Sequence, residues 1–285
     1  MSTKCLLVLN TFKEKSENLA QCIEAYLKSR EVDVERFCYD GAKSPDKAYG
    51  ADFKGRDFVI TLGGDGTVLF ACRGCAPLGI PVFAINLGEF GFLANVSPRE
   101  WQKSLESFLD KKAPVAQRSL VCAEVLRGGK TVFSTSGMND VVLSSLGASR
   151  LANFKVAYNH ALLGPFKANG LIVSTATGST AYSAAAGGPI IDPGLDALLL
   201  TPISSFSLSA RPLVFESHGE LAITVVHSRI NIALSADGQV NFDLEENDVV
   251  ILKIPEYKAK LISATQENFY SALQSKLNWS GGPRA

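Results

Sequence analysis

Apolar and polar positions in the first third of the chain form short hydrophobic runs that alternate with amphipathic stretches. The runs are "CLLVLN" at 5–10, "VDVERFC" at 32–38, "DFVITL" at 57–62 and "IPVFAIN" at 80–86. Between the first two, residues 16–30 place Leu19, Ile23, Tyr26 and Leu27 on one face of a helix. Strands that alternate with helices predict a parallel sheet, and hence a Rossmann-like α/β domain.

A further helix is predicted to begin at "SPRE", residues 97–100. Ser97 as N-cap, Pro98 at the first helical position and Glu100 two residues later form the pattern of a capping box with a pre-set first turn. An apolar face follows, made of Trp101, Leu105, Phe108 and Leu109. We expect this helix to end near Lys112 and the α/β domain to span residues 1–114.

Beyond Pro114 the pattern changes to short β-rich runs separated by turn residues. Gly128 and Gly129 lie between two such runs, which is typical of a hairpin. Further β-rich runs that predict strands are "NDVVLSS", "NFKVAYN", "ELAITVV", "INIALS" and "NDVVILKI". Residues 115–260 are therefore predicted to form a mostly antiparallel β-sandwich domain. The last segment, 261–285, is amphipathic enough to pack on either domain.

One segment of the second domain, residues 171–193, consists mainly of small and hydroxylated residues, "LIVSTATGSTAYSAAAGGPIIDP". Such residues supply little bulk for a core. Two interpretations stay open from the residues alone: a close-packed helix between sheets, or a surface that lets the backbone approach a ligand closely.

The composition and net charge of the chain indicate which classes of binding partner to expect. The 285 residues are 46% hydrophobic and 20% charged, with 28 basic and 28 acidic side chains. With no net charge, neither a nucleic acid nor a membrane surface is expected as a partner. No window approaches the roughly 20 apolar residues of a spanning helix, so we expect a cytoplasmic protein.

The metal-binding residue types are sparse. Cys72 and Cys75 have C-x-x-C spacing but lie within a helical run, and no second pair of cysteines matches them. The three histidines lack the i, i+4 spacing of a metal pair. A metal site built from protein side chains alone is not expected.

The stretch "FVITLGGDGTVLFACR", residues 58–73, carries the first candidate chemistry. A strand, a glycine-rich turn and a helix make a natural phosphate cradle, although the motif is neither G-x-x-x-x-G-K-[ST] nor G-x-G-x-x-G. An acid, Asp65, stands where a phosphate would bind. It is either a turn residue or a group that holds Mg²⁺ or accepts a proton from an attacking hydroxyl.

Other motifs follow the glycine loop in a fixed order: "GGDGT" at 63–67, "NLGEFGFL" at 86–93, "NDVVL" at 139–143, "GLIVSTATGSTAYSAAAGGPI" at 170–190, "SLSARPLVF" at 207–215 and "SADGQ" at 235–239. Together they strongly resemble the NAD kinase family over about residues 55–255. The "GGDGT" motif is shared with diacylglycerol kinases and phosphofructokinases, whereas the T-x-T-G-S-T-A-Y block is more specific.

The resemblance implies roles for individual residues. Asp65 would be the proton acceptor, and the amides of the loop would hold the donor phosphates. The residues implied to bind nucleotide are Gly63, Gly64, Gly66, Thr67, Phe92, Leu93, Asn139, Asp140, Arg150, Lys167, Asn169, Thr177, Thr180, Ala181, Tyr182, Ser183, Ala184, Ala185 and Gln239. Asp140 stands where the family has glutamate, so its reach is shorter while its charge is expected to persist. Asn169 replaces a usual aspartate, which removes a charge.

The resemblance also implies an activity and its partners: phosphorylation of the adenosine 2′-hydroxyl of NAD by ATP or polyphosphate, with Mg²⁺ bound to the nucleotide. NAD would lie in a cleft between the domains, residues 261–285 would return to the first domain, and the chain would form a homodimer or homotetramer. A lipid or sugar kinase sharing the glycine loop, or a non-catalytic NAD(P)-binding sensor, are the alternatives.

Simpler interpretations of single residues also stand. Asn139 would cap a turn before a strand, Tyr182 would lie in the core, and Lys167 and Arg150 would be solvated charges. Asp237 in "SADGQ" is predicted to form an Asp-Gly hairpin turn.

Overall fold

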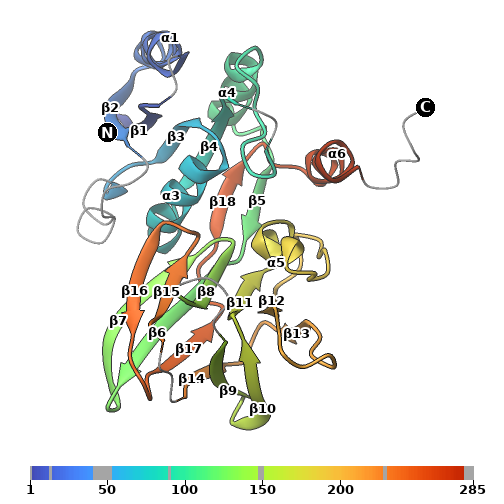
Figure 1. The fold of residues 1–285 in the computed structure, drawn as a ribbon. Helices are drawn as coiled ribbons and strands as arrows, with labels where there is room; N and C mark the ends of the chain where they lie inside the picture. The colour runs from blue at the N-terminus through green and yellow to red at the C-terminus, as the bar shows by residue number, and fades with distance from the viewer. Residues whose placement is uncertain are drawn as a thin grey trace. The chain divides into compact units, whose positions relative to one another are not determined.

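The chain folds into two compact units, seen in Figure 1. Residues 2–12, 15–40, 53–88, 91–146, 151–226 and 230–278 are described by this computed structural model. Unit 1 comprises Met1–Gln117 together with Lys258–Ala285, and unit 2 comprises Arg118–Tyr257. The C-terminal part of the chain thus belongs to the N-terminal unit.

Unit 1 is built on one six-stranded sheet of order β2-β1-β3-β4-β18-β5. The strands are β1 (Thr3–Asn10), β2 (Val32–Tyr39), β3 (Phe58–Gly63), β4 (Pro81–Asn86), β5 (Val115–Arg118) and β18 (Ala259–Ile262). The pairs β1–β2, β1–β3, β3–β4 and β4–β18 are parallel. Every residue of β3 is buried, as in a sheet covered on both faces. The predicted α/β class is confirmed.

The helices of unit 1 are α1 (Lys15–Ser29), α3 (Asp65–Cys75), η1 (Ala76–Leu78), α4 (Trp101–Leu109) and α6 (Gln266–Leu277). Ile23 and Leu27 of α1 and Leu105 of α4 are buried in one cluster with residues of β1, β3 and β4. The thiols of Cys72 and Cys75 lie in the buried face of α3. Burial raises the pKa of Cys75 well above its ordinary value, so this thiol is an apolar packing group rather than a thiolate.

The predicted capping box before α4 is wrong. The helix begins at Trp101 and not at Pro98, and Glu100 occupies the N-cap position without a side-chain cap bond. The Ser97 hydroxyl donates to the Glu100 carboxylate over 2.8 Å, while the Glu100 N–H donates to the Ser97 carbonyl over 3.1 Å. The two side chains bond each other instead of backbone amides, so residues 97–100 form a turn.

Unit 2 consists of two six-stranded sheets, ordered β10-β9-β14-β17-β6-β7 and β13-β12-β11-β8-β15-β16. The strands of the first sheet are β6 (Val121–Arg127), β7 (Lys130–Gly137), β9 (Ala152–Tyr158), β10 (Ala161–Ala168), β14 (Leu221–Val225) and β17 (Val249–Lys253). Those of the second are β8 (Asp140–Ser145), β11 (Gly170–Thr175), β12 (Ala197–Ile203), β13 (Leu213–Glu216), β15 (Ile232–Ala236) and β16 (Val240–Leu244). Residues of both sheets share one buried cluster, so the predicted antiparallel β-sandwich is confirmed.

Both predicted hairpin turns are present. Gly128 and Gly129, with φ of 57° and 77°, join β6 to β7, and Asp237 and Gly238, with φ of 50° and 65°, join β15 to β16. Two consecutive positive φ angles give the tight turn whose twist suits paired antiparallel strands.

The segment 171–193 is not a helix between sheets. It begins as the fully buried strand β11, which pairs with β8 and β12, and continues as η2 (Thr177–Thr180) and the short α5 (Tyr182–Ala185). Gly178 lies against the backbone of Asn139, since a Cβ there would be 1.9 Å from the carbonyl oxygen of Asn139. The small residues permit close approach of one backbone to another.

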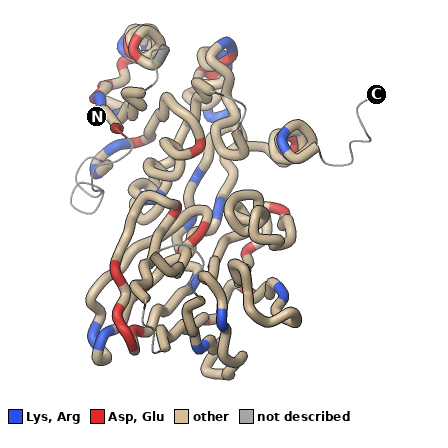
Figure 2. The backbone as a smooth tube through the Cα atoms, viewed as in Figure 1, with Lys and Arg blue, Asp and Glu red and all other residues tan. Residues whose placement is uncertain are grey.

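Charged side chains of both signs are spread over both units (Figure 2). In the described part of the chain, none of the helices has the length and apolar character needed to cross a membrane.

Candidate active site

The glycine loop of unit 1 joins β3 directly to α3. Gly64 is the N-cap of α3 and offers no side-chain cap, so the helix begins at Asp65. Gly63 lies so close to the first turn that a Cβ would be 2.2 Å from the Thr67 hydroxyl oxygen. Asn10, at the end of β1, donates its amide to the same oxygen over 3.2 Å. The loop is thus held against the ends of two neighbouring parallel strands, where α/β sheets bind phosphates.

The carboxylate of Asp65 accepts backbone N–H groups from three consecutive residues. Phe92 donates to Oδ2 over 2.9 Å, while Leu93 and Ala94 donate to Oδ1 over 3.2 and 3.0 Å. Gly91 permits this approach, because a Cβ there would lie 2.0 Å from Oδ1. Phe92 and Leu93, implied by resemblance as ligand-lining residues, therefore touch Asp65 through their backbones. A carboxylate has about four lone-pair positions, so about one stays open.

The 91–94 segment is supported by the C-terminal helix. The rings of Phe92 and Phe269 of α6 lie 6.0 Å apart, and Lys276 Nζ lies 5.7 Å from the Phe92 ring centroid. Thr265 caps α6 in a capping box with Asn268.

A pocket of about 490 Å³ lies beside the glycine loop. It is lined by Asn18, Leu19, Cys22, Asn86, Leu87, Gly88 and Pro98. The Leu87 N–H donates to the Gly63 carbonyl over 2.8 Å, which joins the pocket wall to the loop. None of these residues was singled out from the sequence as a site residue.

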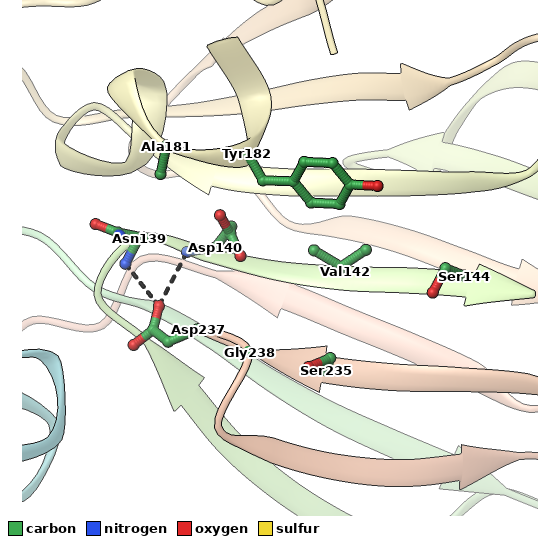
Figure 3. A pocket seen from close by; sticks show the side chains of 9 residues that line it. All are labelled: Asn139, Asp140, Val142, Ser144, Ala181, Tyr182, Ser235, Asp237 and Gly238. Carbon is green, nitrogen blue, oxygen red and sulfur yellow. Dashed lines mark hydrogen bonds between the residues drawn. The ribbon is translucent and has the colours of Figure 1, made fainter. Parts of the chain in front are cut away.

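A second pocket, of about 370 Å³, lies in unit 2 and is shown in Figure 3. It is lined by Asn139, Asp140, Val142, Ser144, Ala181, Tyr182, Ser235, Asp237 and Gly238. The structure brings together four residues that sequence resemblance implied: Asn139, Asp140, Ala181 and Tyr182. Tyr182 is 46% exposed, so its interpretation as a core residue is wrong. Val142, Ser144 and Ser235 were missed, although the alternation of β8 and β15 places their side chains on the pocket face.

The charge of Asp140 depends on pH. Burial, and secondarily the charge of Asp237, raises the pKa of Asp140 from 3.8 to about 7. The expectation that the charge of this acid persists therefore needs correction, since burial brings the protonation of its carboxyl into the neutral pH range.

Several residues of the T-x-T-G-S-T-A-Y block serve the backbone around the pocket. Thr175 donates its hydroxyl to the Met138 carbonyl over 2.7 Å and accepts the Gly178 N–H over 3.1 Å. Ser183 is fully buried, with its hydroxyl 2.8 Å from that of Thr201. The Thr180 hydroxyl donates to the Thr177 carbonyl over 3.3 Å. Ala184 is half-buried and Ala185 exposed at the end of α5.

Lys167, Asn169 and Gln239 lie outside the described pocket lining. Lys167 Nζ lies 5.1 Å from the Phe206 ring centroid, on an exposed edge of unit 2. Asn169 is bonded through its backbone to Ser145 and Ile203, and Gln239 donates its N–H to the Ala236 carbonyl. Arg150 lies outside the described residues.

Metal-ligating side chains do not gather in either site. Within the described ranges, no group of three or more His, Cys, Asp or Glu residues is placed to hold a metal ion.

A parallel sheet with a glycine loop opening a helix, combined with an antiparallel sandwich that carries a polar pocket, defines a two-unit protein of the GGDGT kinase class. Models of the ATP-NAD kinase N-terminal and C-terminal domains match residues 47–113 and 138–264. The chain belongs to the NAD kinase family.

Curated relatives agree with this assignment, and solved structures share the fold. The chain is 45% identical to an NAD kinase of Treponema denticola, covering 98% of this chain and 97% of that protein, and 43% identical to one of Treponema pallidum, covering 98% and 90%. Its fold is similar to yeast NADH kinase in complex with NADH, with a TM-score of 0.87 at 24% identity over 100% of this chain and 90% of that one. It is also similar to an Archaeoglobus fulgidus NAD kinase in complex with ATP, with a TM-score of 0.77 at 24% identity over 98% and 100%.

Proposed function

We propose that this protein transfers a phosphoryl group from ATP to the 2′-hydroxyl of the adenosine ribose of NAD, giving NADP. One observation carries the proposal: a single chain of the NAD kinase family has both a glycine loop that bears an acid and a polar pocket. The pocket is lined by the Asn139–Asp140 and Ala181–Tyr182 pairs. Polyphosphate is a second donor consistent with such a loop.

Asp65 is the proposed proton acceptor, and the loop of Gly63, Gly64, Gly66 and Thr67 is the proposed phosphate site. Phosphoryl transfer needs positioning and charge neutralisation more than covalent help from the protein. The three N–H bonds to Asp65 support this role, because they fix the direction of the one lone pair left for a hydroxyl.

The pocket of unit 2 is the proposed site for part of NAD. Asn139 and Tyr182 offer an amide and an aromatic face, which suit the hydrogen-bonding edges and flat rings of a dinucleotide. The other residues proposed to contribute to binding are Phe92, Leu93, Arg150, Lys167, Asn169, Thr177, Thr180, Ser183, Ala184, Ala185 and Gln239.

Mg²⁺ is proposed to enter with the nucleotide and to neutralise the charge of the donor phosphates. Asp65 is the acid of the glycine loop, and most lone pairs of its carboxylate already accept backbone N–H groups, so few remain to bind Mg²⁺. Phosphate oxygens would therefore supply most of the ligands.

We also propose a cytoplasmic homodimer or homotetramer that assembles through unit 2. Phe206 is 71% and Leu208 92% exposed, and the Phe206 N–H donates to the carbonyl of Lys167 in the edge strand β10, on which Leu162 is 60% exposed. Large exposed apolar side chains are typical of a surface that is covered in the assembly. Sedimentation at micromolar concentration tests this, and a mass of one chain would contradict it.

The activity is tested by incubating purified protein with NAD, ATP and Mg²⁺ and measuring NADP. Omitting Mg²⁺ and adding excess chelator should abolish the product. A lipid or sugar kinase would leave NAD unchanged, and a sensor would bind NAD without converting it. Family membership over the whole chain favours neither alternative.

A further inference from the structure

Two aspartates, one in each unit, hold a run of three consecutive backbone amides in the same way. We call this arrangement a three-amide clamp. Asp65 holds residues 92–94, and Asp237 holds residues 138–140: Met138 donates to Oδ2 over 2.9 Å, and Asn139 and Asp140 donate to Oδ1 over 2.8 and 3.2 Å.

A glycine precedes the clamped run in both units. In unit 2 this is Gly137, where a Cβ would lie 2.4 Å from the Asp140 carbonyl oxygen and 3.1 Å from Asp237 Oδ1. In unit 1 the carboxylate itself excludes a side chain at Gly91, whereas in unit 2 the Asp140 carbonyl excludes one at Gly137 and the Asp237 carboxylate lies just beyond it.

The clamp of Asp237 exceeds what its turn requires. Asp237 has φ of 50° and lies in the Asp-Gly turn between β15 and β16, where asparagine or glycine would serve equally well. Its own N–H also donates to the Asp140 carbonyl over 3.0 Å, so four hydrogen bonds join this turn to residues 138–140. Figure 3 shows the Asp237 carboxylate approaching the backbone of Asn139 and Asp140, while the Asp140 side chain points toward α5.

We propose that Asp237 is a positioning residue of the unit 2 pocket, which fixes the Asn139–Asp140 backbone so that both side chains are presented to the dinucleotide. The proposal rests on the proposed function of this pocket. Asp237 acts through its neighbours, because its carboxylate oxygens are occupied by amides.

The carboxylate has a second effect on the pocket. Asp237 and Tyr182 are the titratable side chains that share the described pocket lining with Asp140. The negative charge of Asp237 adds to burial in raising the pKa of Asp140. Removing this charge should therefore move the pH dependence of NAD binding toward lower pH.

The test compares Asp237→Gly with the matched control Asn247→Gly. Asn247 is also a left-handed turn residue of unit 2, with φ of 67°, so both variants place glycine where φ is positive. Hydrogen exchange of the 138–140 amides and the dissociation constant for NAD are measured in both proteins. We expect faster exchange and at least tenfold weaker NAD binding for Asp237→Gly alone.

Asp237→Asn is a second, milder variant that should change amide exchange and NAD affinity less than Asp237→Gly. It also provides a test if Asp237→Gly does not fold. One amide oxygen can still accept the Asn139 and Asp140 N–H groups, while the NH₂ faces Met138. Exchange and affinity should therefore lie between wild type and Asp237→Gly.

Unchanged exchange at 138–140 in Asp237→Asn, or NAD affinity equal to that of the control variant, would overturn the proposal. Wild-type protein that binds no NAD would instead refute the proposed function, and the exchange measurement would still decide whether the clamp orders residues 138–140.

Discussion

Replacing Asp65 by asparagine changes two properties of unit 1 at once. Asparagine is close in shape to aspartate, so from the sequence alone Asp65→Asn is expected to remove turnover and to leave the melting temperature unchanged. The contacts predict otherwise. Oδ1 accepts two N–H groups and Oδ2 accepts one, whereas an amide has one accepting oxygen and presents NH₂ to the remaining N–H.

The magnitude follows from these bonds. A hydrogen bond to a charged group contributes about 1.5–3 kcal/mol and one between neutral groups about 0.5–1.5 kcal/mol. Asp65→Asn loses one charged bond and weakens two by about 1–1.5 kcal/mol each, so the unfolding free energy should fall by about 4–6 kcal/mol and the melting temperature by about 8–24 °C. Loss of the proposed proton acceptor should lower turnover by a further factor of about 10²–10⁴.

Gly91→Ala separates the two effects. Its Cβ would lie 2.0 Å from Asp65 Oδ1, so it displaces the 91–94 segment while the carboxylate remains. Steady-state NADP formation, NAD binding by calorimetry and thermal unfolding are measured for both variants. If Gly91→Ala lost as much turnover as Asp65→Asn, loop geometry would explain the loss. Wild-type turnover in Asp65→Asn would refute the role of Asp65 as a base.

Three further outcomes are expected. Folding raises the pKa of Asp140 from 3.8 to about 7, so the wild-type protein loses up to about 4 kcal/mol of unfolding free energy as pH rises through 7. Asp140→Asn should therefore raise the unfolding free energy by at most about 4 kcal/mol at pH 8 and leave it unchanged at pH 4. Urea titrations of both proteins at the two pH values measure the difference. Phe269→Ala should lower the unfolding free energy by about 3–5 kcal/mol and speed amide exchange at 92–94, whereas Tyr270→Ala, whose 45% exposed ring lies edge-on to Phe269 at 5.4 Å, should do less of both. Asn169→Asp should change the KM for NAD more than kcat in steady-state assays, since the proposed contact is alike in ground and transition states.

The order of strands and helices could be predicted from the sequence because it depends on local signals. Buried runs such as β3 and turn pairs such as Gly128–Gly129 and Asp237–Gly238 each specify their own geometry. The prediction of local structure failed where residues with a typical local pattern form other hydrogen bonds instead. Ser97 and Glu100 have the residue types of a capping box but bond each other. Of the two interpretations left open for residues 171–193, the helix between sheets does not hold, because the segment pairs first as strand β11.

From the sequence, the site residues could be predicted only by their types and their order along the chain, and not by their arrangement in space. Asn139, Asp140, Ala181 and Tyr182 were identified by resemblance, and the structure brings them into one pocket. The clamps were not predictable, because the bonded residues lie 27–29 and 97–99 positions apart along the chain. The pKa of Asp140 also depends on burial, which no local pattern reveals.

The two clamps suggest why an acid stands in each glycine-containing turn. A carboxylate that accepts three amides has its rotamer and its plane fixed, so its remaining lone pair has one direction. For Asp237 this rigidity would serve neighbouring side chains, and for Asp65 it would serve the carboxylate itself. A hydroxyl that must meet both a proton acceptor and a phosphorus atom gains most from such a fixed direction, because misplacement by about 1 Å can cost a factor of about 10² in rate. The turn and base interpretations of Asp65 are therefore compatible: the bonds that make it structural also aim it.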